Sequence, residues 1–188
     1  MTATTDSGVR QRTRRAILEA AASLWARDFS ASLGDIADRA EVSRSTLHRY
    51  FPERQMLVDG LLLDSQTRLE AAWNAAVAVS GTAMEMIENI MSAIVDLADR
   101  ILFLFSDPAR FEGNPHWRSD EDEDMTRLIR AAQDDGELDP DIAPSFVTGV
   151  MYSLIYVTAE SVASGALPRH KAAETAVRIF RHGLSPRG

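Results

Sequence analysis

Residues 32–52 read SLGDIADRAEVSRSTLHRYFP, and most of what can be inferred about this chain begins with these 21 residues. Ser32 and Asp35 match a capping box, in which a hydroxyl accepts from a backbone amide and a carboxylate reaches back, so they predict a brief helix. Ser43 is a second N-cap candidate and predicts another short helix over residues 44–50. Two short helices joined by a tight turn, the second with a polar face around one buried Leu, are typical of a helix-turn-helix. An ordinary helical hairpin with a solvated face has the same spacing.

Helical spacing of apolar residues dominates the rest of the chain, and no convincing alternating strand is present. A first helix is predicted at about residues 10–27, where apolar side chains recur every three or four positions. Further helices are predicted, with breaks that contain Gly, Pro or Asp, at about residues 52–79, 82–105, 117–134, 141–164 and 169–183. The sequence therefore predicts an all-α fold of about nine helices.

Composition excludes several classes of protein. The chain has 188 residues, of which 45% are hydrophobic and 26% charged, so it can bury a core and is not intrinsically disordered. It has no cysteine, which excludes disulfides, thiolate zinc sites, iron–sulfur clusters and cysteine nucleophiles. The four histidines, at positions 48, 116, 170 and 182, lack close ligand spacing, so we expect no metal and no cofactor.

An enzyme is not expected, because no Gly-rich phosphate loop, G-x-S-x-G elbow or H-E-x-x-H motif is present. The amino terminus has no apolar stretch behind its arginines, so it does not resemble a secretory signal. Residues 142–159 form an uncharged run, but its many hydroxyls and small residues favour a helix buried against other helices over a membrane span. We therefore expect a cytoplasmic protein without a membrane partner.

Charge is divided unevenly along the chain. Residues 1–56 hold nine arginines and seven acids, a balance of +2, whereas residues 57–188 have a balance of −10. This asymmetry indicates a segment that faces a polyanion, joined to a body that avoids one. Arg10 and Arg12 lie just before the predicted helix-turn-helix, where they can reach the flanking DNA backbone.

The runs RRAILEAA at residues 14–21 and DIADRAEVSRSTLHRYFPER at residues 35–54 closely resemble the DNA-binding domain of TetR-type bacterial transcriptional regulators. The resemblance covers about residues 10–57. It departs from the usual pattern at Glu41, where the family has Gly, and in a short connection between the first two helices. It implies a helix-turn-helix domain over residues 1–56 and a larger helical ligand-binding and dimerisation domain over residues 57–188.

By position, the resemblance also implies which side chains meet DNA. Those implied to face base edges are Arg44, Ser45 and His48. Those implied to face phosphates are Thr46, Arg49, Tyr50 and Arg54. Taken singly, Arg49 or Arg54 would also suit a surface ion pair, and Tyr50 a ring in the core.

The larger domain is expected to hold a dimer interface and an effector site. A helix that is apolar nearly all round suggests that the last two helices pair with their copies, and the candidate interface residues are Gly149, Ser153, Ala173, Ala176, Val177 and Phe180. Aromatic and methionine side chains suit a mostly apolar effector, although most such residues belong to cores. The pocket candidates are Trp73, Met91, Phe103, Phe111, Trp117, Met151, Tyr152 and Tyr156.

The resemblance thus implies a homodimeric, sequence-specific regulator of transcription. By the habit of the family we expect a repressor that an unidentified small molecule releases from a pseudo-palindromic, double-stranded DNA operator. Two alternatives stay open at this point. One is a helical protein–protein adaptor, and the other is an activator without a small-molecule effector. Salt-dependent binding to duplex DNA separates the adaptor from a regulator.

Overall fold

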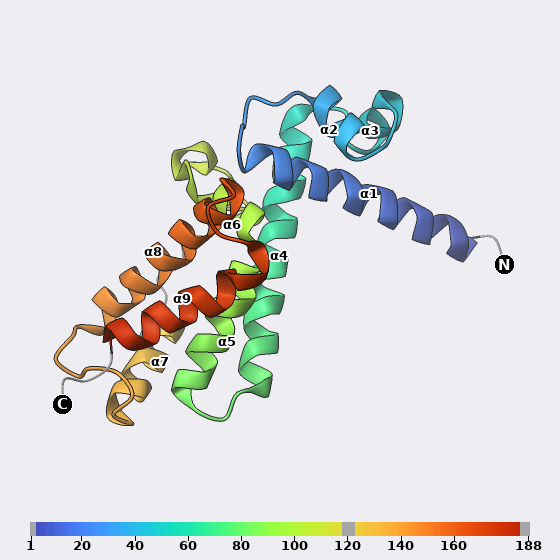
Figure 1. Cartoon of the computed structure of the whole chain (residues 1–188). Helices are drawn as coiled ribbons and strands as arrows, with labels where there is room; N and C mark the ends of the chain where they lie inside the picture. The colour runs from blue at the N-terminus through green and yellow to red at the C-terminus, as the bar shows by residue number, and fades with distance from the viewer. Residues whose placement is uncertain (1–2, 118–122, 185–188) are drawn as a thin grey trace. The chain divides into compact units, whose positions relative to one another are not determined.

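The computed structural model describes residues 3–117 and 123–184. Over these residues the chain forms nine α-helices and one short 3₁₀ helix, η1, with no β-strand (Figure 1). The elements are α1 (Ala3–Trp25), α2 (Leu33–Arg39), α3 (Arg44–Tyr50), α4 (Arg54–Val79), α5 (Ala83–Val95), α6 (Ala98–Phe105), η1 (Pro108–Phe111), α7 (Glu123–Asp134), α8 (Pro144–Ala163) and α9 (Arg169–Leu184). The predicted all-α architecture is confirmed.

The helices are distributed over two compact units. Within the described residues, unit 1 comprises residues 3–67 and 103–117, and unit 2 comprises residues 68–102 and 123–184. Unit 1 therefore combines the N-terminal helices with η1, a segment from much later in the chain. These are units of packing, so the domain boundary between residues 56 and 57 stays a prediction.

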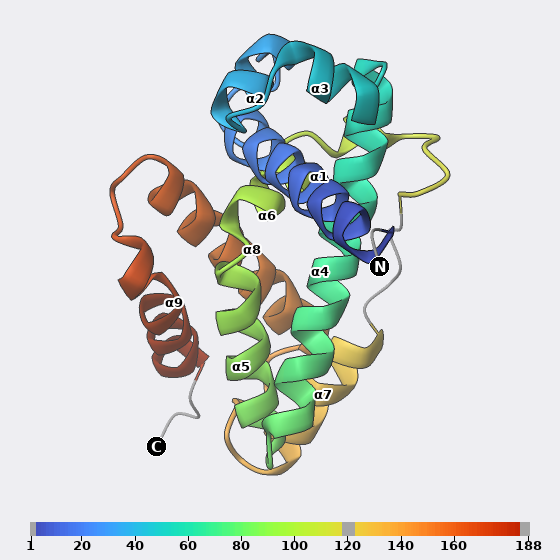
Figure 2. The same ribbon diagram turned by 90° about the vertical axis from the view of Figure 1, so that its right-hand side faces the viewer.

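Unit 1 is built around the apolar face of α1. Ile17 and Ala21 are completely buried, as are Ile36 and Ala37 of α2. Helix α2 begins with the predicted capping box: Asp35 N–H donates to the Ser32 hydroxyl at 3.2 Å, and Ser32 N–H donates to the Asp35 carboxylate at 2.8 Å. α2 packs against both α1 and α3 (Figure 2). The buried face of α2 thus braces α3.

The turn between α2 and α3 has a left-handed residue at Glu41, with φ 56°. The N–H groups of Glu41 and Val42 donate to the carbonyls of Asp38 and Ala37, which is the Schellman arrangement that ends a helix. Glycine usually takes this position because it has no Cβ, and a Glu here costs about 1 kcal/mol. The turn therefore keeps its helix-ending geometry despite the departure from the family pattern.

Unit 2 contains α5, α7, α8 and α9. Helix α5 packs against the other three, and α8 packs against both α7 and α9. α5 begins with a second capping box between Thr82 and Glu85 and buries Ile87, Ile90 and Met91 completely. The single helix predicted at 82–105 is in fact two helices. Near Leu97 the backbone N–H groups bond three residues back instead of four, and this tightening separates α5 from α6.

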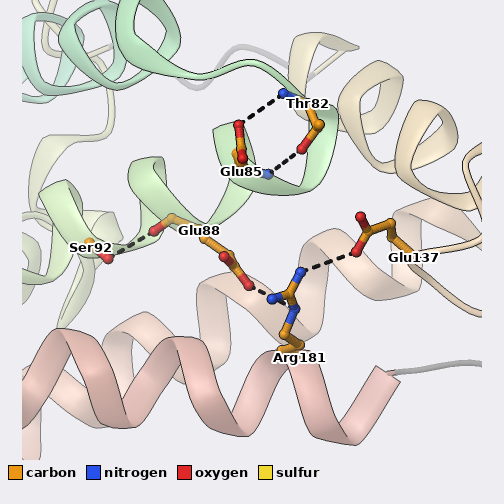
Figure 3. A network of polar contacts seen from close by, with 6 residues as sticks. All are labelled: Thr82, Glu85, Glu88, Ser92, Glu137 and Arg181. Atoms are coloured by element: carbon orange, nitrogen blue, oxygen red, sulfur yellow. Dashed lines mark hydrogen bonds and ion pairs between the residues drawn. The ribbon is translucent and has the colours of Figure 1, made fainter.

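Arg181 of α9 bridges two other parts of unit 2 (Figure 3). Its Nε lies 3.1 Å from Glu88 of α5, and its Nη2 donates to Glu137, after α7, at 3.1 Å. These ion pairs are partly exposed, so each adds only a modest energy. The two ion pairs connect α9 to α5 and to the segment that follows α7.

Candidate DNA-recognition surface

Helix α3 is fixed at its start and on its inner face. The Ser43 hydroxyl accepts from Thr46 N–H at 3.1 Å, which caps the helix. On the opposite side Leu47 is buried to 2% exposure, and Phe51, directly after the helix, to 4%. Burying such side chains is worth about 1.5–3 kcal/mol each. This anchoring leaves the other side of α3 free to meet a ligand.

The free side of α3 carries Arg44, Ser45, His48 and Arg49, all of them exposed. Their spacing of i, i+1, i+4 and i+5 places them on one helical face. Thr46 and Tyr50 are only partly exposed and flank Leu47. The structure thus brings together the three residues implied to read bases, with a guanidinium at each end of the set.

Arg54 is not placed as a phosphate contact. Its guanidinium donates to the carbonyl oxygen of Ala31 at 2.7 Å and also to that of Phe29. Its Cζ lies 4.7 Å from the Trp25 ring centroid and 5.0 Å from that of Phe29. The Arg54 guanidinium is therefore engaged within unit 1 by two carbonyls and by two rings that lie next to each other. This internal role corrects the prediction, because the short connection between α1 and α2 turns its carbonyls toward α4.

A second arginine, Arg110 of η1, packs on the connection between α1 and α2. Its Cζ lies 3.7 Å from the Phe29 ring centroid, and its Nη1 donates to the Phe103 carbonyl at 3.1 Å. Desolvation lowers the pKa of Arg110, and the nearby Arg54 adds to the lowering, while Asp107 opposes it. No sequence pattern indicates this contact, since nothing in the run PARF distinguishes Arg110 from a surface residue. Its effect is to attach η1 to the DNA-binding helices.

The arginines before the helix-turn-helix lie on α1. Arg10 and Arg12 are exposed, as expected for side chains that reach a DNA backbone. Arg14 instead lies over the Phe51 ring, with its Cζ 5.5 Å from the ring centroid. Arg10 and Arg12 thus stay candidates for phosphate contacts.

One side of α8 is apolar yet exposed. Phe146 is 63% exposed, Val157 54% and Tyr152 39%, and Gly149 and Ser153 lie between them on the same stripe. The other side of α8 is buried through residues such as Met151 and Ile155. Among the described helices, α8 is also the one long and apolar enough to cross a membrane, a test that the core helices of soluble proteins pass as well. Gly149, Ser153 and Tyr152 of this stripe thus stay candidates for an interaction surface.

The interface candidates on α9 are placed differently. Ala176 is completely buried and Phe180 is 1% exposed within their own chain, so neither offers its side chain to a second molecule. Ala173 and Val177 are partly exposed, and Ile179, which we did not predict, is 53% exposed. Helical periodicity alone could not tell the intrachain face of α9 from an outer one.

The eight pocket candidates are divided between the units. Phe103, Phe111 and Trp117 belong to unit 1, where Phe103 meets Phe111 edge to face and Phe111 stacks on Trp117, each pair with ring centroids 5.2 Å apart. Four others, in unit 2, are partly or fully buried, and these are Trp73, Met91, Met151 and Tyr156. Tyr152 lies on the exposed stripe of α8 instead. Within residues 3–117 and 123–184, no group of three or more His, Asp or Glu side chains could hold a metal ion.

Comparison with known proteins places this arrangement in a family. Residues 17–61 match the profile of bacterial regulatory proteins of the tetR family. The HTH-type transcriptional repressor LfrR of Mycolicibacterium smegmatis is 30% identical over 179 residues, which is 95% of this chain and 94% of LfrR. The chain belongs to the TetR family. It is therefore a helix-turn-helix, DNA-binding regulator of transcription, and its relative LfrR is a transcriptional repressor.

Solved structures of TetR-family proteins have the same fold. The crystal structure of LfrR from Mycobacterium smegmatis in complex with proflavine matches with a TM-score of 0.73 at 30% identity, covering 94% of this chain and 98% of that one. KstR2 of Mycobacterium tuberculosis, a ketosteroid transcriptional regulator, matches with a TM-score of 0.76 at 19% identity, covering 93% and 95% of the two chains. At 19% identity, the similarity to KstR2 shows only that the two proteins share a fold.

Proposed function

We propose that this TetR-family protein is a repressor that binds a pseudo-palindromic operator as a homodimer and that a mostly apolar small molecule releases it. The observation that carries the proposal is the exposed face of α3, which presents Arg44, Ser45 and His48 beside the flanking Arg49. A helix held in this way fits the major groove, and Arg44 can bind guanine O6 and N7 with two donors. The protein would act in the bacterial cytoplasm, where its DNA lies.

The proposed homodimer uses the exposed stripe of α8. Apolar side chains such as Phe146 and Val157 would be buried by a second copy, while Gly149 and Ser153 allow the two helices to approach closely. In a two-fold dimer the same stripe occurs on both chains, so one patch serves both. We propose the partly exposed Ala173 and Val177 of α9 as further members of this interface.

For the effector we propose a planar, mostly apolar compound. Support comes from LfrR, which was crystallised with proflavine, a planar aromatic compound, and which is 30% identical to this chain. Within unit 2 we propose that the partly or fully buried candidates line the effector site, and these are Trp73, Met91, Met151 and Tyr156. The attachment of η1 to Phe29 through Arg110 gives a route by which a change near residues 103–117 reaches the DNA-binding helices.

DNA reading is tested by selecting duplexes from a random pool with the wild-type protein and then measuring Arg44→Ala. We expect selected sites to be inverted repeats with half-sites about one helical turn or a multiple of it apart. Arg44→Ala should weaken binding to the selected operator by about tenfold and hardly change binding to a random duplex, because a lost base contact costs about 1–3 kcal/mol. Fluorescence anisotropy at a fixed salt concentration measures the affinity for the selected operator and for the random duplex.

Two results would count against this part of the proposal. Absence of any selected sequence would contradict sequence-specific repression. Equal losses by Arg44→Ala on specific and random duplexes would make Arg44 a phosphate contact. A reporter gene behind the selected operator should be silenced by the protein, whereas increased transcription would identify an activator.

Effector binding is tested by tryptophan fluorescence with proflavine and a panel of apolar planar compounds. We expect quenching that depends on Trp73, so Trp73→Phe is the matched control. A compound that binds should lower operator affinity by about 5- to 150-fold, the usual range of allosteric coupling. A compound that saturates the protein and leaves operator affinity unchanged would show that its site does not control DNA binding.

A further inference from the structure

Gly34 of α2 lies directly beneath the side chain of Arg44 of α3. A Cβ placed on Gly34 would be 3.1 Å from Arg44 Nη2, 3.2 Å from Cζ and 3.2 Å from Nε. Because these three atoms share one plane and are almost equally distant, the guanidinium lies flat over the glycine. A Cβ at position 34 would be in close contact with the guanidinium, which would have to move away from α2 by a few tenths of an ångström.

The neighbouring residue helps to hold Arg44 there. Asp35 Oδ2 accepts from the Ser32 backbone N–H at 2.8 Å and from the Ser32 hydroxyl at 2.7 Å, which fixes the carboxylate at the start of α2. These bonds lower the pKa of Asp35, and the positive charge of Arg44 adds a smaller lowering. The hydrogen bonds to Ser32 hold the Asp35 carboxylate in place, and its negative charge attracts the guanidinium of Arg44 toward α2.

A guanidinium that rests on one face keeps its edge available. Its N–H donors lie in the plane of the group, so stacking on backbone blocks none of the forked pairs that recognise guanine. Arg44 is in fact exposed despite the stacking. Restricting a flexible side chain in its binding orientation reduces the entropy lost on association.

From this geometry we infer that Gly34 is a positioning residue for operator recognition: its missing side chain lets Arg44 lie flat on α2 and so sets the direction in which Arg44 reads a base. The inference rests on the proposed function, since it assigns Gly34 a part in the base reading attributed to Arg44. Gly34 contacts no DNA itself in this scheme. It acts only through the guanidinium.

The test is a double-mutant cycle with Gly34→Ala and Arg44→Ala on the operator selected by the wild-type protein. We expect Gly34→Ala to weaken operator binding by about tenfold, comparable to loss of one base contact, and to have no further effect once Arg44 is Ala. Random-duplex affinity should be unchanged. The melting temperature should be equal or higher, because Ala favours a helix over Gly.

Gly183→Ala is the matched control. Gly183 also lies in a helix, and a Cβ there would have no other atom within 4 Å, so the same change should leave operator binding unaltered. The inference is overturned if Gly34→Ala leaves operator affinity unchanged or lowers it equally with and without Arg44. It is also overturned by an equal loss on random duplex or by a lower melting temperature, each of which would make Gly34 a packing residue. Failure of the wild-type protein to select any operator would instead refute the proposed function.

Discussion

Val157→Glu is expected to give a folded protein that is monomeric at micromolar concentration and binds its operator at least about a hundredfold more weakly. Val157 is 54% exposed on the apolar stripe of α8. In a two-fold interface the new carboxylate occurs twice, so two buried charges of the same sign face each other without partners. A monomer has one DNA-binding domain instead of two, so it loses the gain in affinity from bivalent binding, which is about 10²- to 10⁴-fold.

Sedimentation equilibrium gives the mass, and anisotropy with the selected operator gives the affinity. The matched control is Val79→Glu at the end of α4, where an apolar side chain is 78% exposed away from the α8 stripe. This variant adds the same charge and should remain dimeric with unchanged operator affinity. A Val157→Glu protein that is still dimeric at micromolar concentration would place the interface elsewhere.

The local motifs were predictable from sequence because they depend on a few neighbouring residues. Ser32 with Asp35, and Ser43 before α3, act within one turn of the chain, and both form the predicted hydrogen bonds. Leu47 is buried as its position on the helix requires. Helical periodicity likewise predicted the remaining α-helices, although α1 begins at Ala3 instead of about residue 10 and η1 was not predicted. The split between α5 and α6 was also missed, because a shift to tighter hydrogen bonding produces it without any Gly or Pro.

The errors concern contacts between distant parts of the sequence. Arg54 resembles a DNA-binding residue by position, but its partners are loop carbonyls 23 and 25 residues earlier. Arg110 reaches Phe29 from a segment that no sequence pattern links to the first helices. Phe180 was assigned to an outer surface because periodicity shows that a face is apolar and does not show what covers it. The flat stacking of Arg44 over Gly34 likewise requires coordinates.

Arg54→Ala is expected to destabilise unit 1 by about 3 kcal/mol and to abolish binding to both operator and random duplex. The substitution leaves the carbonyls of Phe29 and Ala31 without their charged donor, and a hydrogen bond to a charged group contributes about 1.5–3 kcal/mol. It also removes the cation that lies close to both the Trp25 and Phe29 rings, where such a contact is worth about 0.5–2 kcal/mol. Not all of this is additive, so the total stays near 3 kcal/mol.

Arg54→Lys should rescue little of this loss, because a single ammonium cannot bond two carbonyls in a fork while it stacks on two rings. Arg49→Ala is the matched control, since Arg49 is exposed and contacts only the ring of its neighbour Tyr50, with Cζ 5.7 Å from the ring centroid. That variant should melt like the wild type and lose DNA affinity alone. Thermal melting by circular dichroism, followed by anisotropy below the melting temperature, separates the two effects. An Arg54→Ala protein with wild-type melting and a DNA affinity reduced as in Arg49→Ala would return Arg54 to the phosphate contacts and refute its internal role.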